Sequence, residues 1–354
     1  MQQSKVFVNQ TRTQPKPTPP ASNFGVSKVD VKPKKQRRRR RWLGLPVLLL
    51  LAGVGGWWLF YHPASDNNVA TTAIQPPNNN DVSCVEQPKF LQNMHLTTSP
   101  AFSTSERGLK GLALLIPQAQ GQSTTYQHPS WGNAGSLATL EFGRGGDLFV
   151  IPAPSINVLY NPADQQNQVY RVDSTTQEMA RFVTLPRAAP PSDENPFGAL
   201  GLGFDCQTNR LYVSSVAGSN RDQEVGRIYV VDVDKATVQT ELDNVDPIGL
   251  AVFNGAKGKR LYYGLARYPE VWSIGLDERG NFVGQSRLEF SLANLGARGS
   301  DKARKLEFVQ GNQMLVHGIE FSFNLIAPTE KQETAYRFKY EPTKDNWSQI
   351  KDKT

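Results

Sequence analysis

The chain has 354 residues, a formal net charge of +7, 24 prolines, 29 glycines, four histidines and two cysteines. So few cysteines and histidines, far apart in sequence, exclude a zinc site built from clustered ligands. The basic excess lies entirely within residues 1–41, which hold twelve Lys or Arg and one acidic residue, so the remainder carries −4 and nucleic-acid binding is not expected.

Residues 1–41 combine prolines with Gln, Ser, Thr and Lys, and contain little that could bury a core. We therefore predict a disordered, basic, proline-rich tail. Its polybasic end, next to an apolar run, would also attract anionic lipid headgroups.

The next segment, residues 42–61, has no charged residue and is long enough as a helix to span about 30 Å of hydrocarbon. Trp42 stands at one end, and Trp57, Trp58 and Tyr61 at the other, as the two interfaces of a bilayer favour. The segment is preceded directly by Arg37, Arg38, Arg39, Arg40 and Arg41. Positive charge beside a span is retained in the cytoplasm, so the sequence predicts an N-inside, single-pass anchor.

This topology would place the C-terminal domain in the periplasm or outside the cell, on the inner membrane of a bacterium. Two kinds of export signal are alternatives. A cleaved signal peptide would need an unusually long basic region and a clear A-x-A site, and the arginine run satisfies a twin-arginine pattern trivially. A buried core helix is a third alternative. Residues 62–88 are polar, with Pro and Asn clusters, and predict a linker.

The rest, residues 89–354, predicts an all-β domain of repeated strand groups. The clearest groups cover residues 200–242 and 248–290, and weaker copies cover 137–185 and 304–350. Two more strands are predicted at residues 108–116 and 123–131. Equivalent aromatic positions in the four groups are Tyr170, Tyr229, Trp272 and Tyr336.

Serial four-strand units at roughly this period predict a β-propeller of five or six blades. Six blades would result if a terminal strand completed a blade shared by both chain ends. A β-sandwich is the alternative architecture, but the repetition of similar units in series favours the propeller over it.

The segments "NRLYVSSV" (209–216), "DPIGLAVF" (246–253) and "GKRLYYGLA" (258–266) resemble the YVTN/NHL/lactonase-like group of bacterial β-propellers. That group repeats an "rLYV" strand and a "P-x-G-(I/L)-A" opening. The resemblance covers about residues 200–290 and concerns the fold more than the function.

Some members of that group are metal-dependent lactonases or esterases with Glu, Asn and Asp at the channel mouth. The resemblance implies candidates at the ends of the predicted inner strands: Glu141, Asp205, Asn254 and Glu307. They would hold a divalent cation only if their oxygens converge; otherwise they cap turns. Neither a GxSxG nor an HExxH motif is present, and His317, within an apolar strand, is more typical of a hydrogen-bonded core histidine than of a base.

Two functional hypotheses follow. The first is a membrane-anchored, extracytoplasmic binding or scaffolding module for protein or cell-envelope partners. The second is an anchored, metal-dependent lactonase-like hydrolase. The inserts at residues 187–199 and 291–303 are the predicted places for a partner-binding patch.

Cys84 and Cys206 would both face an oxidising compartment under this topology, where paired thiols often form a disulfide. The bond would close a loop of about 120 residues and stabilise the fold by roughly 4–5 kcal/mol in a chain-entropy estimate. The alternative is a small buried Cys206 and a free thiol at Cys84.

Overall fold

The computed structural model describes residue 84 and residues 86–104, 109–118, 121–153, 163–187, 189, 194–310, 312–323 and 332–351. The chain divides into two units, residues 1–65 and 66–354, and every described residue belongs to the second. The predicted tail, the predicted span at 42–61 and nearly all of the predicted linker lie outside the described residues. Within the described ranges no helix is long and apolar enough to cross a membrane.

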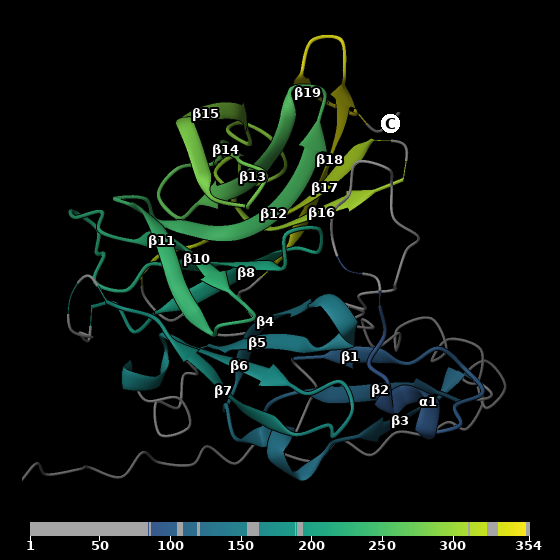
Figure 1. The fold of residues 1–354 in the computed structure, drawn as a ribbon. Helices are drawn as coiled ribbons and strands as arrows, with labels where there is room; N and C mark the ends of the chain where they lie inside the picture. Colours follow the sequence, from purple (N-terminus) through teal and green to yellow (C-terminus); the bar gives the residue numbers. More distant parts are fainter. Residues whose placement is uncertain are drawn as a thin grey trace, which may run out of the picture. The chain divides into compact units, whose positions relative to one another are not determined.

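After a single turn of helix, α1 (Phe90–Asn93), the described chain forms five antiparallel sheets in sequence order (Figure 1). The first sheet contains β1 (Ala101–Ser103), β2 (Ala113–Pro117) and β3 (Ser123–Tyr126). The second contains β4 (Leu137–Phe142), β5 (Leu148–Pro152), β6 (Gln168–Val172) and β7 (Met179–Thr184). The third contains β8 (Ala199–Asp205), β9 (Arg210–Ser215), β10 (Arg227–Asp232) and β11 (Thr237–Asp243). The fourth contains β12 (Pro247–Gly255), β13 (Gly258–Leu265), β14 (Glu270–Leu276) and β15 (Phe282–Ser291), and the fifth contains β16 (Lys302–Val309), β17 (Gln313–Ile319), β18 (Thr334–Glu341) and β19 (Asn346–Gln349).

Each sheet is an up-and-down meander in which consecutive strands pair, which is the blade of a β-propeller. The predicted repeats at 137–185, 200–242, 248–290 and 304–350 coincide with the second to fifth sheets. The four aromatic positions, Tyr170, Tyr229, Trp272 and Tyr336, each occupy the third residue of the third strand. The prediction of an all-β propeller of five or six blades is thus confirmed, and the described sheets number five.

The first sheet corrects the prediction of four-stranded blades throughout, because it has three strands among the described residues. The strand predicted at 123–131 ends at Tyr126. Pro129 starts a short 3-10 helix, Pro129–Gly132, in which Trp131 is fully buried and its indole N–H donates to the Gln177 carbonyl over 2.8 Å. The six-blade alternative, with one blade shared by both chain ends, is not seen in the described sheets, since each is built from consecutive strands.

The innermost strands β4, β8, β12 and β16 run in the same direction. The first part of each of these strands contacts the first part of its neighbour. Glycines allow this close approach. A Cβ built on Gly249 would lie 2.7 Å from the Ala303 carbonyl oxygen, and one on Gly264 would lie 2.1 Å from the same atom. Only a residue without a side chain fits there, so these glycines set the spacing between the fourth and fifth sheets.

Aromatic rings fill the space between successive sheets. Phe149 stacks on Phe204 between the second and third sheets, with ring centroids 5.7 Å apart. Phe253 lies 4.6 Å from Phe308 between the fourth and fifth. Neighbouring sheets thereby bury each other's apolar faces, as radial packing requires.

Candidate functional site

The two ends of the channel carry connections of different length. Because the inner strands run in the same direction, the turns that follow the first and third strand of each sheet lie together. In the second to fifth sheets these turns are tight: residues 143–147, 173–178, 206–209, 233–236, 256–257, 277–281, 310–312 and 342–345. We call this the short-turn end. The opposite, long-loop end carries longer connections, including residues 185–198, 216–226 and 292–301.

The four residues predicted from the family resemblance all fall in the last part of an inner strand, near the short-turn end. Asp205 is fully buried there and accepts hydrogen bonds from Lys259 Nζ and Thr208 Oγ1, both over 2.7 Å. Strand register places Asn254 opposite Lys259, which brings Asn254 into the same neighbourhood as Asp205. Glu141 pairs across the second sheet with Phe149.

Glu307 belongs to a separate charged cluster on the fifth sheet. It forms ion pairs with Lys305 and with His317 Nε2, the latter over 3.4 Å, and His317 Nδ1 contacts Glu333. Burial opposes the charge of His317, but its two carboxylate partners outweigh burial and raise its pKa to about 9. Burial likewise opposes the charge of Glu307, yet hydrogen bonding to His317 and the charge of Lys305 lower its pKa to about 2.

His317 is therefore a hydrogen-bonded cation at neutral pH. It is half-buried, and it does not belong to the apolar core. Among the described residues, no three His, Cys, Asp or Glu side chains are arranged to hold a metal ion. The oxygens of Asp205 and Glu307 serve internal ion pairs, so these residues do not fit a divalent cation as they stand.

The long-loop end has a different feature, the guanidinium of Arg304 on β16. Its Nη1 donates to the Ile248 carbonyl over 3.2 Å, and its Nη2 donates to the Ala138 carbonyl over 3.0 Å. These carbonyls belong to β12 and β4, so a single side chain joins three of the four inner strands. Burial lowers the pKa of Arg304 to about 10, against the opposing charge of Glu333.

An aromatic cluster adjoins this position. Phe321 lies 5.3 Å from Phe197 and 5.7 Å from Phe323 between ring centroids. All three pack against an apolar group that includes Ile248, and Phe197 and Phe321 remain half-buried. The long-loop end therefore presents partly accessible aromatic surface next to a cation.

A buried ion pair organises the loops at this end. Arg267 Nε donates to Asp246 Oδ2 over 2.7 Å, and its other nitrogens bond backbone carbonyls of the 216–226 loop. Asp246 is fully buried, and burial raises its pKa despite hydrogen bonds from Ser219 and Arg267. The guanidinium carbon of Arg267 also lies 5.4 Å from the centroid of Phe323, which couples the loop to the aromatic cluster.

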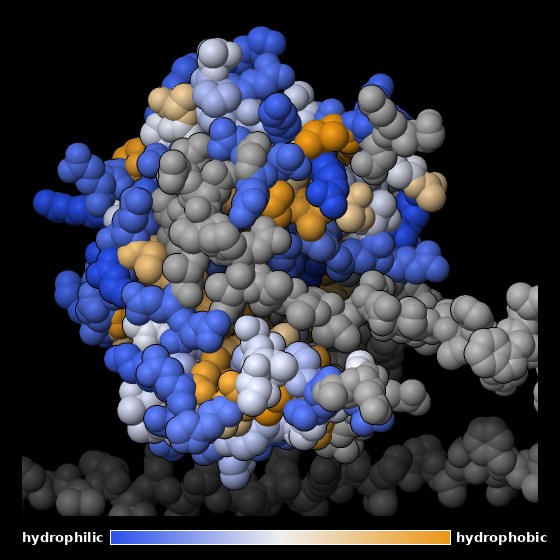
Figure 2. Space-filling model, turned by 90° about the vertical axis from the view of Figure 1, so that its right-hand side faces the viewer, coloured by the Kyte–Doolittle hydropathy of each residue, from blue (hydrophilic) through white to orange (hydrophobic). Residues whose placement is uncertain are grey.

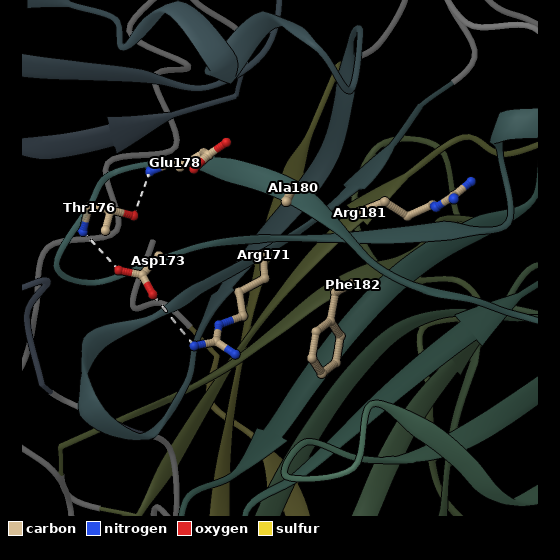
Figure 3. Close-up of a pocket in the computed structure, with 7 residues that line it drawn as sticks. All are labelled: Arg171, Asp173, Thr176, Glu178, Ala180, Arg181 and Phe182. Carbon is tan, nitrogen blue, oxygen red and sulfur yellow. Dashed lines mark hydrogen bonds and ion pairs between the residues drawn. The ribbon is translucent and has the colours of Figure 1, made fainter.

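A pocket of about 340 Å³ lies elsewhere, on the hairpin of β6 and β7 (Figure 3). In the close-up Arg171 reaches toward Asp173, while Arg181 extends away from it. Arg171 is held by Asp147 over 2.8 Å, and Asp173 caps the turn by accepting from the N–H groups of Thr175 and Thr176. Arg171 and Asp173 thus stabilise the hairpin and the neighbouring turn.

The short-turn end holds the N-terminal segment of the domain. Cys84 is bonded to Cys206, with a Cα–Cα distance of 5.1 Å. Arg144 donates to the Cys206 carbonyl, and the N–H of Phe90 donates to the Ser174 carbonyl over 2.9 Å. The segment is thus fastened to turns of the second and third sheets.

Sequence reasoning missed Arg304 and the aromatic cluster. The segment "RKLEF" (304–308) is typical of an ordinary strand with solvated charges, and only the direction of the inner strands shows that Arg304 enters the channel. Phe197 lies in the 187–199 insert, one of the two inserts, with 291–303, that were predicted as places for a partner-binding patch.

Comparison with known proteins adds no family to this description. Neither the search of protein-family profiles nor the search of curated proteins finds a match. Among solved structures, a Thermus thermophilus oxidoreductase assigned as a glucose dehydrogenase matches with 16% identity and a TM-score of 0.40, over 66% of this chain and 77% of that one. A Xanthomonas campestris gluconolactonase matches with 18% identity and a TM-score of 0.38, over 62% and 64%. The WD40 domain of Neurospora crassa Pan2 matches with 12% identity and a TM-score of 0.39, over 70% and 60%. At these scores the matches carry no argument about function.

Proposed function

We propose that this protein is a β-propeller anchored by residues 42–61 outside the cytoplasm, where it binds or scaffolds a protein or cell-envelope partner. The juxtaposition of Cys84 and Cys206 carries the proposal. They are the chain's only cysteines, 122 positions apart, and they are paired. Such pairing is typical of proteins in oxidising compartments. It supports the topology that the arginine run and the apolar segment predict.

The binding surface proposed is the long-loop end. Phe197 and Phe321 are half-buried there, and Tyr268, in the connection between β13 and β14, is 55% exposed. Exposed aromatic rings are enriched where proteins bind one another. The fastening of Cys84 at the short-turn end also fits, because the long-loop end then lies opposite the point where the linker arrives.

The face drawn in Figure 2 is mainly hydrophilic, with small separate hydrophobic areas. The lactonase-like alternative receives less support, because it needs free oxygens at Asp205 and Glu307, and both carboxylates are held in ion pairs.

Site-specific photo-crosslinking in the native host tests the proposal. A photoreactive residue at Tyr268 should yield a discrete protein adduct, whereas one at the exposed Glu278, in a turn at the short-turn end, should not. Equal labelling at both positions, or no adduct at Tyr268, would contradict the choice of surface.

A further inference from the structure

Arg304 has more hydrogen-bond donors than it has partners among the described residues. A guanidinium carries five N–H groups, and two of them are directed at the Ile248 and Ala138 carbonyls. None of the ion pairs formed between described residues includes Arg304, although carboxylates satisfy the other cations around it. The residue is half-buried, so part of its surface remains accessible.

The charges around Arg304 leave a local excess of one positive charge. Lys305 and His317 are cations, and Glu307 and Glu333 are the carboxylates that pair with them. These four groups cancel. Glu333 also attracts Arg304, so the five groups together carry one net positive charge, and with a pKa of about 10 Arg304 is protonated at neutral pH.

Apolar surface lies beside this charge. Ile248, whose carbonyl accepts from Arg304, contributes its side chain to the apolar group on which Phe197 and Phe321 pack. A ligand that reached the free N–H groups of Arg304 would therefore meet aromatic rings nearby.

We propose that the long-loop end of the channel is a carboxylate-binding site. Arg304 takes the carboxylate with its free N–H groups, and Phe197 and Phe321 contact the apolar part of the ligand. A planar guanidinium suits a carboxylate because two parallel hydrogen bonds can form. The carboxylate belongs either to a small organic acid or to an Asp or Glu side chain of a peptide.

Isothermal titration calorimetry of the full chain in lipid nanodiscs tests this site, with empty nanodiscs as the baseline. Benzoate and its neutral counterpart benzamide are compared first. Benzoate should bind at least tenfold more tightly, and Arg304→Gln should remove that difference. Arg181→Gln, which changes an exposed arginine on β7, should leave it intact.

Two further measurements test the aromatic contact and the source of the carboxylate. Phe321→Ala should weaken benzoate severalfold more than it weakens succinate, since only benzoate carries a ring. An Asp-containing hexapeptide that binds more tightly than succinate indicates a peptide source, and the reverse order indicates a small acid.

Equal affinity of the wild-type protein for benzoate and benzamide would overturn the proposal, whatever the folding of Arg304→Gln. So would an equal loss of benzoate binding in Arg181→Gln. Either outcome leaves the proposed topology and partner-binding surface untouched, because those are tested by crosslinking.

Discussion

The Cα atoms of Cys84 and Cys206 lie 5.1 Å apart although 122 positions separate them in the chain. Their bond ties the start of the domain to the turn after β8, and Arg144 holds the same turn through the Cys206 carbonyl. The N-terminal segment is therefore part of the folded domain from Cys84 onward.

We predict that replacing both cysteines, Cys84→Ser with Cys206→Ser, lowers the free energy of unfolding by about 2–5 kcal/mol, because the unfolded chain regains the entropy of a long loop. Urea unfolding of residues 84–354, followed by circular dichroism, measures the change. The wild-type fragment should show a β-type spectrum and lose the same stability when reduced. A midpoint that does not respond to reductant would contradict the structural role of the bond.

Arg267 should be among the most sensitive surface-proximal positions. Arg267→Met leaves the fully buried Asp246 without its cation, which costs about 3–5 kcal/mol for a buried pair. Thermal unfolding should show the loss. Arg221→Met, at an exposed position in the same loop, is the matched control and should change stability by less than about 0.5 kcal/mol. Equal effects would mean that the ion pair does not organise the loop.

His317 should titrate far above the usual histidine range. Its pKa is raised from 6.5 to about 9, so the stabilisation it provides is complete below pH 6.5 and is lost as the pH rises through 9. The pKa of Glu307 is lowered from 4.5 to about 2, so its contribution is present above pH 4.5 and is lost as the pH falls through 2.

NMR titration of the imidazole measures this directly, and Glu307→Gln should move its midpoint down toward the ordinary value. A midpoint for His317 near 6.5 in the wild type would rule out the charged cluster.

Gly264→Ala should destabilise the contact between the fourth and fifth sheets. The new Cβ would lie 2.1 Å from the Ala303 carbonyl oxygen, and the backbone there has no flexible side chain to yield. We expect a loss of about 1–3 kcal/mol, as for overpacked cores. Gly132→Ala is the control, because its Cβ would meet nothing nearer than 3.4 Å. Similar melting temperatures for the two variants would contradict the close packing of the inner strands.

The sequence predicted most of the fold because blade strands are specified locally. Val, Ile and Tyr alternate within segments such as "RIYVVD", and Asp and Gly mark the turns between them. Strand β1 was missed because three residues carry too little pattern. The site was harder to predict. Asp205 does lie at the end of an inner strand, as predicted. Its ion-pair partner Lys259 belongs to the next sheet, so only the packed structure shows that the carboxylate is bound by a lysine. Arg304 was missed for the same reason.

A topology reporter tests whether the propeller lies outside the cytoplasm. Alkaline phosphatase, which is active only outside the cytoplasm, is fused after Thr354 in a bacterial host. The same fusion lacking residues 37–61 serves as control. We expect high phosphatase activity for the full chain and none for the control. Activity of a cytoplasmic reporter at Thr354, with an inactive phosphatase fusion, would contradict this expectation.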